Sequence, residues 1–332
     1  MVLWLAGVAA AVEVGGDLHT AGRAYTELPA TGVSRGVELV RARAAGELAT
    51  ESVSARLTLL MAPSGGEDGY VGVSGESWVP VVEIAEGRLH LPAGVVIGAG
   101  LVDTPSLLPV LEVWRLPSVA PALEEWMTPR SDEGGYVDWA HPDAPVGARL
   151  AAVAGEGAAT RERNNGVDVA GVFWARPVEP LTLMVHGRDG SVGLEQGRNH
   201  RAGAGVLLDL PDTVAAGLEG HLGWGFEGDL SLLPGGWGAW ARSGDALPVI
   251  AWASLYALRH HRPDPDSSDS TLRLGCGPRI GDPEGGSGWL AAGWEMRRLG
   301  SNASAIAGDA ATLHTIFVQL DVRLSAQTGG AP

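Results

Sequence analysis

The clearest pattern in the chain is an alternation of apolar and polar residues near its C-terminal end. Successive side chains of a β-strand point to opposite faces, so residues two apart share a face. Between Thr315 and Leu324 the apolar face comprises Ile316, Val318, Leu320, Val322 and Leu324, and the polar face comprises Thr315, Gln319, Asp321 and Arg323. The segment therefore predicts an amphipathic strand.

The first strand-like segment repeats this pattern with a heavily ionisable polar face. Its polar side chains are Glu13, Asp17, His19, Arg23 and Tyr25. Burying such groups in a dry core costs several kcal/mol each unless they are paired. Because a water-filled lumen carries no comparable cost, the pattern favours a membrane barrel that is apolar outside and polar inside.

Strands of this kind recur along the whole chain, and no linker separates halves of different composition. The further candidates are residues 37–46, 53–62, 77–85, 88–102, 134–140, 147–155, 167–176, 181–188, 201–210, 214–226, 236–242, 249–259, 271–279 and 289–298. With the first and last segments they make about sixteen strands, an even number within the range of outer-membrane barrels.

The connections between these strands alternate in length. Tight turns are expected at residues 85–87, 175–180, 210–213, 243–245 and 281–285, and longer polar links at 63–76, 156–166, 189–200, 228–235, 262–270 and 300–313. An up-and-down meander across a membrane predicts this alternation, whereas a Greek-key sandwich does not. We expect the tight turns at the periplasmic rim and the longer links outside.

Tryptophans fall near the ends of the predicted strands, which is typical of the aromatic girdles of membrane barrels. The candidates are Trp78, Trp139, Trp224, Trp237, Trp289 and Trp294. A place in the core or the lumen is the alternative for some of them.

Composition narrows the class of protein further. The 332 residues include 49 glycines, 23 basic residues that are all arginine, and 39 acids, for a formal net charge of −16. Such an acidic chain is not expected to bind nucleic acid. The single cysteine, Cys276, allows no intrachain disulfide and is expected to behave as a small apolar residue beside Leu272 and Leu274.

The N-terminal segment, residues 1–11, is apolar and ends in small residues, as a truncated export signal would. It lacks a positive n-region, so an upstream start or membership of the first strand are the alternatives. The expected division is a signal peptide at 1–11, the barrel at 12–326 and a tail at 327–332. No later stretch has 18 continuous apolar residues, so any membrane span should be β.

Several segments resemble a known family. They are Gly-Val-Glu-Leu-Val-Arg-Ala-Arg at 36–43, Ser-Ala-Arg-Leu-Thr-Leu at 54–59, the expected hairpin around 86–88, Asn-Asn-Gly at 164–166 and Arg-Pro-Val-Glu-Pro at 176–180. Their order resembles the porin O and P family, the phosphate-selective porins and their relatives. The resemblance implies an all-β, transmembrane, up-and-down antiparallel β-barrel of 16 strands, often trimeric, with an in-folded constriction loop. The phosphate selectivity of that family looks tied to lysine, which this chain lacks.

The resemblance places the constriction loop at residues 103–133, and the alternation of the predicted strands places arginines on lumen faces. The candidate pore-lining residues are Arg41, Arg43, Arg56, Arg149, Arg188, Arg201, Arg242, Arg273, Arg297 and Arg323. The candidate loop residues are Asp103, Glu112, Arg115, Glu124, Glu125, Arg130, Asp132 and Glu133. An acidic loop facing arginine strands would set a field across the channel and sort solutes by charge. The alternative is that these arginines and acids only neutralise one another.

Other classes of function have weaker support. Glu124 with Glu125, or Asp132 with Glu133, could serve an outer-membrane hydrolase, but the chain has no catalytic or cofactor-binding motif. Asp264, Asp266 and Asp269 lack the full signature of a calcium loop. A secreted β-sandwich that binds carbohydrate would bury one continuous apolar core, which these strands do not predict.

The sequence thus predicts a porin in the outer membrane of a Gram-negative bacterium, weakly selective for small polar solutes and ions. It is expected not to be an enzyme and to need no metal or cofactor. The expected partners are outer-membrane lipid, lipopolysaccharide, the diffusing solutes and further copies in a homotrimer.

Overall fold

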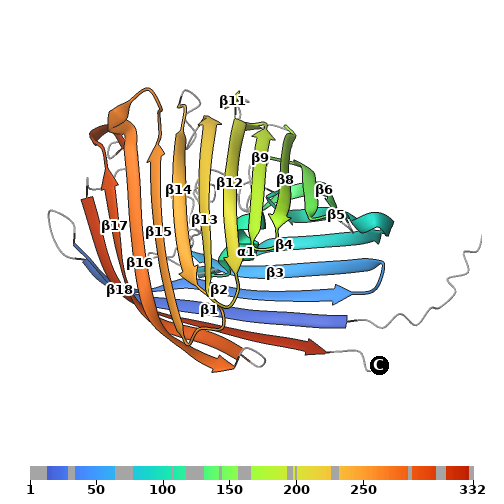
Figure 1. Cartoon of the computed structure of the whole chain (residues 1–332), viewed down its shortest axis with the longest axis horizontal. Coiled ribbons are helices and arrows are strands. Elements are labelled where there is room, and N and C mark those ends of the chain that lie inside the picture. Colours follow the sequence, from blue (N-terminus) through green and yellow to red (C-terminus); the bar gives the residue numbers. More distant parts are fainter. Residues whose placement is uncertain are drawn as a thin grey trace, which may run out of the picture.

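The chain folds into a closed antiparallel β-barrel (Figure 1). The computed structural model describes residues 13–28, 34–63, 78–105, 108–116, 131–141, 144–155, 166–192, 197–198, 200–225, 232–282, 286–303 and 312–328. Neighbouring strands follow one another in sequence around the barrel, and the first strand pairs with the last to close it. The predicted fold class is confirmed.

Sixteen strands form the barrel wall. They are β1 (Glu13–Glu27), β2 (Ser34–Ala49), β3 (Val53–Pro63), β4 (Trp78–Leu91), β5 (Val95–Asp103), β6 (Ser131–Ala140), β7 (Val146–Val153), β8 (Asp168–Val178), β9 (Leu181–Asp189), β12 (His200–Leu210), β13 (Val214–Trp224), β14 (Gly235–Ser243), β15 (Val249–Arg259), β16 (Ser268–Asp282), β17 (Gly286–Leu299) and β18 (Thr312–Thr328).

The remaining described elements lie in the connections. The strands β10 (Ser191–Val192) and β11 (Gly197–Arg198) form a separate hairpin between β9 and β12. The helix α1 (Leu108–Trp114) lies between β5 and β6, and the 3-10 turns η1 (Pro92–Gly94) and η3 (Pro265–Ser267) follow β4 and β15. No helix among the described residues is long and apolar enough to cross a membrane.

The two faces of the wall differ as the alternation predicts. Outward side chains are apolar and exposed, and the examples include Leu18, Leu57, Leu150, Val185, Leu218 and Ile316. Inward positions of the same strands carry polar groups such as His19, Thr58, Glu219 and Asp321. Large exposed apolar surfaces mark membrane or protein contacts, and an apolar outer surface on a closed barrel fits a bilayer.

Short and long connections lie at opposite ends of the barrel. The described short turns, at residues 50–52, 92–94, 179–180, 211–213 and 244–248, lie at the end where β1 begins and β18 ends. We call this the short-turn end. The links of β1 to β2, β3 to β4, β5 to β6 and so on lie at the opposite, long-link end. β18 ends at Thr328 rather than at the predicted residue 326.

The turn predicted at residues 85–87 is wrong. β4 continues through Gly87, which pairs with both Ala55 and Ala99, and the chain reverses at η1 instead. Ala93 and Gly94 there have φ values of 62° and 73°, in the left-handed region. Glycine suggested a turn at position 87, but only the Pro-Ala-Gly segment supplies the conformation that reverses the chain.

Tryptophans lie on both faces of the wall. Trp224 and Trp237 are exposed on outward positions near the long-link end, and Trp294 stacks on His314 at the same end. Trp139 occupies an outward position near the short-turn end. These positions agree with two aromatic girdles, whereas Trp289 is only 5% exposed and belongs to an interior cluster, so its girdle assignment is wrong. The side chain of Trp78 lies outside the described residues.

Glycines on inward positions allow large rings to lie against the wall. A Cβ atom on Gly147, Gly217, Gly275 or Gly293 would collide with Trp174, Trp240, Trp252 or Phe317, respectively, on the neighbouring strand. Each ring therefore covers a glycine instead of projecting across the lumen. Such pairing of glycine with an aromatic side chain fixes strand register and uses little lumen space.

Candidate functional site

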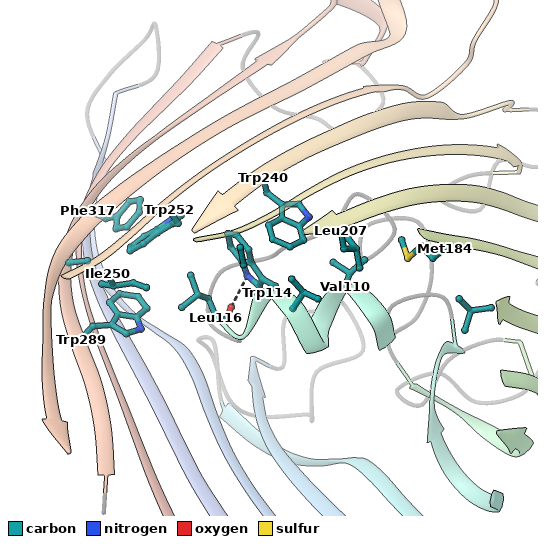
Figure 2. Close-up of a cluster of buried hydrophobic side chains, with 14 residues drawn as sticks. Val110, Trp114, Leu116, Met184, Leu207, Trp240, Ile250, Trp252, Trp289 and Phe317 are labelled. Carbon is teal, nitrogen blue, oxygen red and sulfur yellow. Dashed lines mark hydrogen bonds between the residues drawn. The ribbon is translucent and has the colours of Figure 1, made fainter. Parts of the chain in front are cut away.

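The helix α1 lies inside the barrel, where its apolar face packs on the inner wall (Figure 2). Trp114 is 1% exposed and meets the Trp240 ring edge-on, with ring centroids 5.0 Å apart. Val110 is equally buried and belongs to the same cluster as Leu207. A seven-residue helix is not stable alone, so this packing is what stabilises it.

The cluster extends along the wall beyond the helix. Trp252 and Trp289 lie 5.1 Å apart between ring centroids, and Phe317 joins them. Figure 2 shows Leu116, just after the helix, on the same side as these rings, and its carbonyl accepts a hydrogen bond from Trp114 Nε1. One part of the inner wall is therefore covered by apolar side chains that pack against the helix region.

Polar contacts fasten the end of α1 to the short-turn end of the barrel. Arg242 is 2% exposed and donates to the Val113 carbonyl from Nε at 3.1 Å and from Nη2 at 3.0 Å. Arg115 donates to Asp245 at 2.6 Å and to Asp209 at 2.7 Å, and Arg242 donates to Asp245 at 2.8 Å. We call Arg115, Asp209, Arg242, Asp245 and the Val113 carbonyl the helix latch.

The latch suits the chemistry of a helix C-terminus. The last carbonyls of a helix lack intrahelical donors and carry partial negative charge, so a guanidinium is a favourable partner. Arg115 follows the helix with φ of 56°, a left-handed conformation that ends the helix and directs the chain away. Glu112, in the last turn of the helix, pairs with Arg176 of β8 at 3.1 Å.

A cavity of about 400 Å³ lies between α1 and the opposite wall, and we call it the eyelet. Its lining comes from β1, β2, β3, β5 and β18 on one side and from the helix region on the other. The lining residues are Asp17, His19, Arg43, Ala45, Arg56, Asp103, Leu108, Leu111, Glu112, Trp114, Arg115, Leu116 and Arg323.

Charges of both signs meet in the eyelet. Arg43 pairs with Glu83 at 2.8 Å, Arg56 with Asp103 at 3.0 Å, and Arg323 with Asp17 at 3.1 Å. His19 Nε2 lies 2.9 Å from Asp321 Oδ1, and both side chains are buried. These ion pairs hold the charged side chains in place against the wall. Because each arginine of a pair is balanced by an acid, the eyelet has little net charge.

The predicted pore-lining arginines divide into two groups. Arg43, Arg56 and Arg323 line the eyelet. The others occupy inward positions elsewhere, and most of them have a carboxylate partner. These pairs are Arg149 with Asp138, Arg188 with Asp168, Arg273 with Glu295, Arg297 with Asp269 and Arg242 with Asp245. Arg201 donates hydrogen bonds to the carbonyls of His200 and Trp224. The side chain of Arg41 lies outside the described residues.

The predicted constriction loop is shorter than residues 103–133. Asp103 ends β5, and Asp132 and Glu133 belong to β6, because these strands pair as far as Asp103 and Ser131. Asp103, Glu112 and Arg115 line the eyelet. Asp132 instead lies 3.6 Å from Arg188 in a buried group near the long-link end, and Glu133 is exposed. Glu124, Glu125 and Arg130 lie outside the described residues.

The sequence predicts an acidic loop that faces an arginine-lined wall. In the described part of the chain, arginines and acids instead occur together on both sides of the eyelet, and most form ion pairs. α1 and the residue after it contribute both Glu112 and Arg115, and the facing wall contributes both arginines and acids. Sequence reasoning missed Asp17 and His19 as eyelet residues, although their place on the polar face of the first strand was a usable signal. It also missed Trp240 and the latch, whose partners are distant in sequence.

The acids of the weak calcium motif do not converge. Asp269 points to Arg297, whereas Asp264 accepts a hydrogen bond from Asn302 at 2.7 Å. Among the described residues no group of His, Cys, Asp or Glu side chains is arranged to hold a metal ion.

A closed sixteen-stranded antiparallel barrel with an apolar exterior and a helix folded into its lumen defines the porin architecture. Neither a family model nor a curated protein sequence matches the chain. Solved structures do match it. An anion-selective porin from Comamonas acidovorans has a TM-score of 0.64 at 12% identity, over 96% of this chain and 100% of that one.

Two further porin structures cover nearly the whole barrel. OmpF of Salmonella typhi, in complex with daunomycin, has a TM-score of 0.64 at 10% identity over 96% of this chain and 98% of that one. The trimer form of OmpT, an outer-membrane protein of Vibrio cholerae, has a TM-score of 0.57 at 10% identity over 96% and 99%. These similarities establish the porin fold, and they do not single out the porin O and P family.

Proposed function

We propose that the chain is an outer-membrane porin through which small polar solutes and ions diffuse passively. The observation that carries this proposal is the eyelet, a cavity lined by fixed charges inside a closed barrel whose outer surface is apolar. A lumen of this kind offers hydrated solutes a polar path across an apolar bilayer. No reaction is needed for this role, and we infer that the protein is not an enzyme.

The connections support an orientation in the membrane. Outer-membrane barrels have short periplasmic turns and longer extracellular loops. We therefore infer that the short-turn end, with the latch, faces the periplasm and that the long-link end faces outward. On this orientation α1 narrows the channel near its periplasmic mouth, because the latch joins it to the end of β12 and to the turn after β14.

The eyelet supports weak charge selectivity. Arg43, Arg56, Arg115 and Arg323 face Asp17, Asp103 and Glu112, so the lining has almost no net charge. Screening over about 8 Å at physiological salt makes these nearby charges more important than the net charge of the whole chain. The acids of the predicted constriction loop, including Glu124 and Glu125, underlie our expectation of a mild cation preference. Glu124 and Glu125 lie outside the described residues.

Phosphate selectivity has little support from the same residues. Capture of phosphate needs several cationic donors that converge and are not opposed by acids. Each eyelet arginine instead has a carboxylate partner, including Glu83 for Arg43 and Asp209 for Arg115. We infer a general channel and not a phosphate-specific one.

A homotrimer remains our proposal for the assembly. It is supported by the porin fold and by the trimeric form of one similar structure. Light scattering of the protein in detergent, corrected for bound detergent, would give the number of copies directly.

Selective labelling of two adjacent residues tests the eyelet as the conducting path. Ala45 lines the eyelet, whereas Ala44 is exposed on the outward face beside Leu18. In a Cys276→Ser background, Ala45→Cys and Ala44→Cys would each be treated with a bulky, charged, membrane-impermeant thiol reagent during recording in planar bilayers. We expect the reagent to reduce the conductance of A45C and to leave that of A44C unchanged.

The same pair of variants gives a clear contrary result. Equal responses of A45C and A44C, or no conductance from folded wild-type barrels, would contradict a conducting eyelet. Heat-modifiable migration on gels would verify that each variant is folded before it is recorded.

A further inference from the structure

The described arginines differ in whether they have an acidic partner. Those on inward strand positions are mostly paired, as in Arg273 with Glu295 and Arg297 with Asp269. Arg259 and Arg298 are exposed on outward positions, and within the described part of the chain neither has a carboxylate partner. Unpaired arginines on the outside of a membrane barrel call for an anionic partner from the membrane.

These two arginines lie close together at the long-link end. Arg259 is the last residue of β15, and Arg298 is the second to last of β17, with one strand, β16, between them. Two strand spacings and an offset of two residues along β16 separate their backbones by about 12 Å. The outward residues of β16 that pair with them are Ser268 and Ser270, whose small side chains leave the space between the guanidinium groups open.

A third arginine completes the group. The Arg262 carbonyl accepts a hydrogen bond from Arg259 Nη1 at 3.4 Å, and the Arg262 guanidinium lies 5.5 Å from the centre of the Trp224 ring. We call Arg259, Arg262 and Arg298 the arginine patch. Contact with the ring and with the Leu233 carbonyl orients Arg262 and still leaves donors available.

The patch lies at the boundary between the apolar band and the polar rim. Along β15 and β17 the preceding outward residues include Leu255, Leu290 and Trp294, and Trp237 of β14 is exposed nearby. Tryptophan marks the level of lipid headgroups in membrane proteins. The arginines just beyond it are therefore at the height where lipid phosphates lie.

Two acids occur in the connection above the patch. Asp264 accepts hydrogen bonds from Asn302 and from the Asp266 amide, and these bonds hold its pKa below the usual value. The hydrogen bond from Asn302 to Asp264 connects the link after β17 to the link after β15. Asp266 is exposed in η3. Within the described part of the chain neither acid forms an ion pair with the patch, so neither one neutralises its positive charge.

We propose that the arginine patch binds the phosphate groups of a lipopolysaccharide-type glycolipid in the outer leaflet. Guanidinium groups bind phosphate through paired, charge-assisted hydrogen bonds, and the separation of Arg259 and Arg298 favours a headgroup with more than one phosphate. This inference rests on the proposed function, which places the long-link end at the outer leaflet.

Native mass spectrometry of the full chain in a nonionic detergent tests the proposal. The probes are a bisphosphorylated lipid A, the same lipid without phosphates, and phosphatidylglycerol. The variant Arg259→Ala/Arg298→Ala is compared with wild type and with Arg35→Ala, an exposed arginine on β2, three strands from β17. We expect the double variant to bind bisphosphorylated lipid A about tenfold more weakly and R35A to bind it like wild type.

Several results would overturn the proposal. They are unchanged binding by the double variant, equal binding of lipid A with and without phosphates, and equally tight binding of phosphatidylglycerol. If the double variant does not fold, as judged by heat-modifiable migration, the single variants Arg259→Gln and Arg298→Gln replace it, each with an expected loss of several-fold.

Conductance separates this proposal from the channel function. Both arginines lie outside the lumen, so the double variant should conduct like wild type. A wild-type barrel that does not conduct would refute the porin function, whereas loss of the phosphate-dependent difference in lipid binding would refute only the patch.

Discussion

Replacing Asp245 by asparagine should loosen α1 and change the channel current. Asp245 accepts hydrogen bonds from Arg115 at 2.6 Å and Arg242 at 2.8 Å, and Arg279 Nη2 lies 3.7 Å away. Asparagine keeps the shape of the side chain but removes its negative charge. The one amide oxygen can still accept a hydrogen bond, but the buried Arg242 loses its anionic partner and keeps the Val113 and Ser243 carbonyls, while Arg115 keeps Asp209.

The expected size of the effect follows from these contacts. Charge-assisted hydrogen bonds contribute about 1.5–3 kcal/mol when buried and less when a partner is exposed. The Asp245 side chain is 41% exposed, so a loss near the lower end, about 1–2 kcal/mol, is reasonable. Since about 1.4 kcal/mol is a factor of ten in an equilibrium constant, the detached state of the helix should become about tenfold more populated.

Single-channel recording in planar bilayers measures this change. Asp245→Asn should show more frequent steps between conductance levels than wild type, with a folded barrel. Asp212→Asn is the matched control, because Asp212 is an exposed acid in the neighbouring turn at residues 211–213. Traces of D245N that match those of wild type and D212N would show that the latch does not hold the eyelet helix.

Further predictions concern the interior of the barrel. Trp240→Ala should remove about 3–5 kcal/mol of packing free energy, because it deletes the ring against which Trp114 of α1 packs. The variant should show more channel noise than wild type, and recording it beside D245N would compare the packing contact with the latch. Gly275→Ala should displace Trp252 and lower the temperature at which gel migration changes; an unaltered temperature would contradict the packing argument. Across a tenfold salt gradient the wild-type reversal potential should be small. Arg323→Gln should shift the reversal potential to the sign of a cation-selective channel, and Asp17→Asn should shift it to the sign of an anion-selective one. A strong anion preference in wild type would contradict our reading of the eyelet. Deleting residues 107–125 should raise conductance, since it removes α1 while β5 and β6 stay paired, and an unchanged conductance would exclude the eyelet as the narrowest point.

The sequence predicts the wall of this barrel better than its interior. Alternation along β18 is a local property, because each side chain's face depends only on its position in the strand. The inward placement of Asp321 and the outward placement of Ile316 therefore follow from the sequence alone. The wrong turn at 85–87 shows the limit, since glycine is compatible with both a turn and a strand and only pairing with β3 and β5 distinguishes them.

Partners that are distant in sequence depend on register and closure, which no local pattern contains. Asp17 and Arg323 are separated by most of the chain and meet only because β1 pairs with β18. Likewise Arg242 reaches the Val113 carbonyl only after α1 folds inward. Sequence reasoning could place these arginines on an inward face, but it could not show that their charges would be neutralised by neighbouring strands.

The filled side of the lumen determines where the open side lies. Gly217 and Gly275 let Trp240 and Trp252 lie flat, so the wall there is smooth and apolar enough to receive a helix. A helix with its side chains is about 10 Å across, a large part of the interior of a sixteen-stranded barrel. On the proposed function, solutes then pass the polar arc from β1 to β3, where Arg43 and Arg56 are paired with acids. The apolar packing of one half of the lumen thus selects which charges a solute meets in the other.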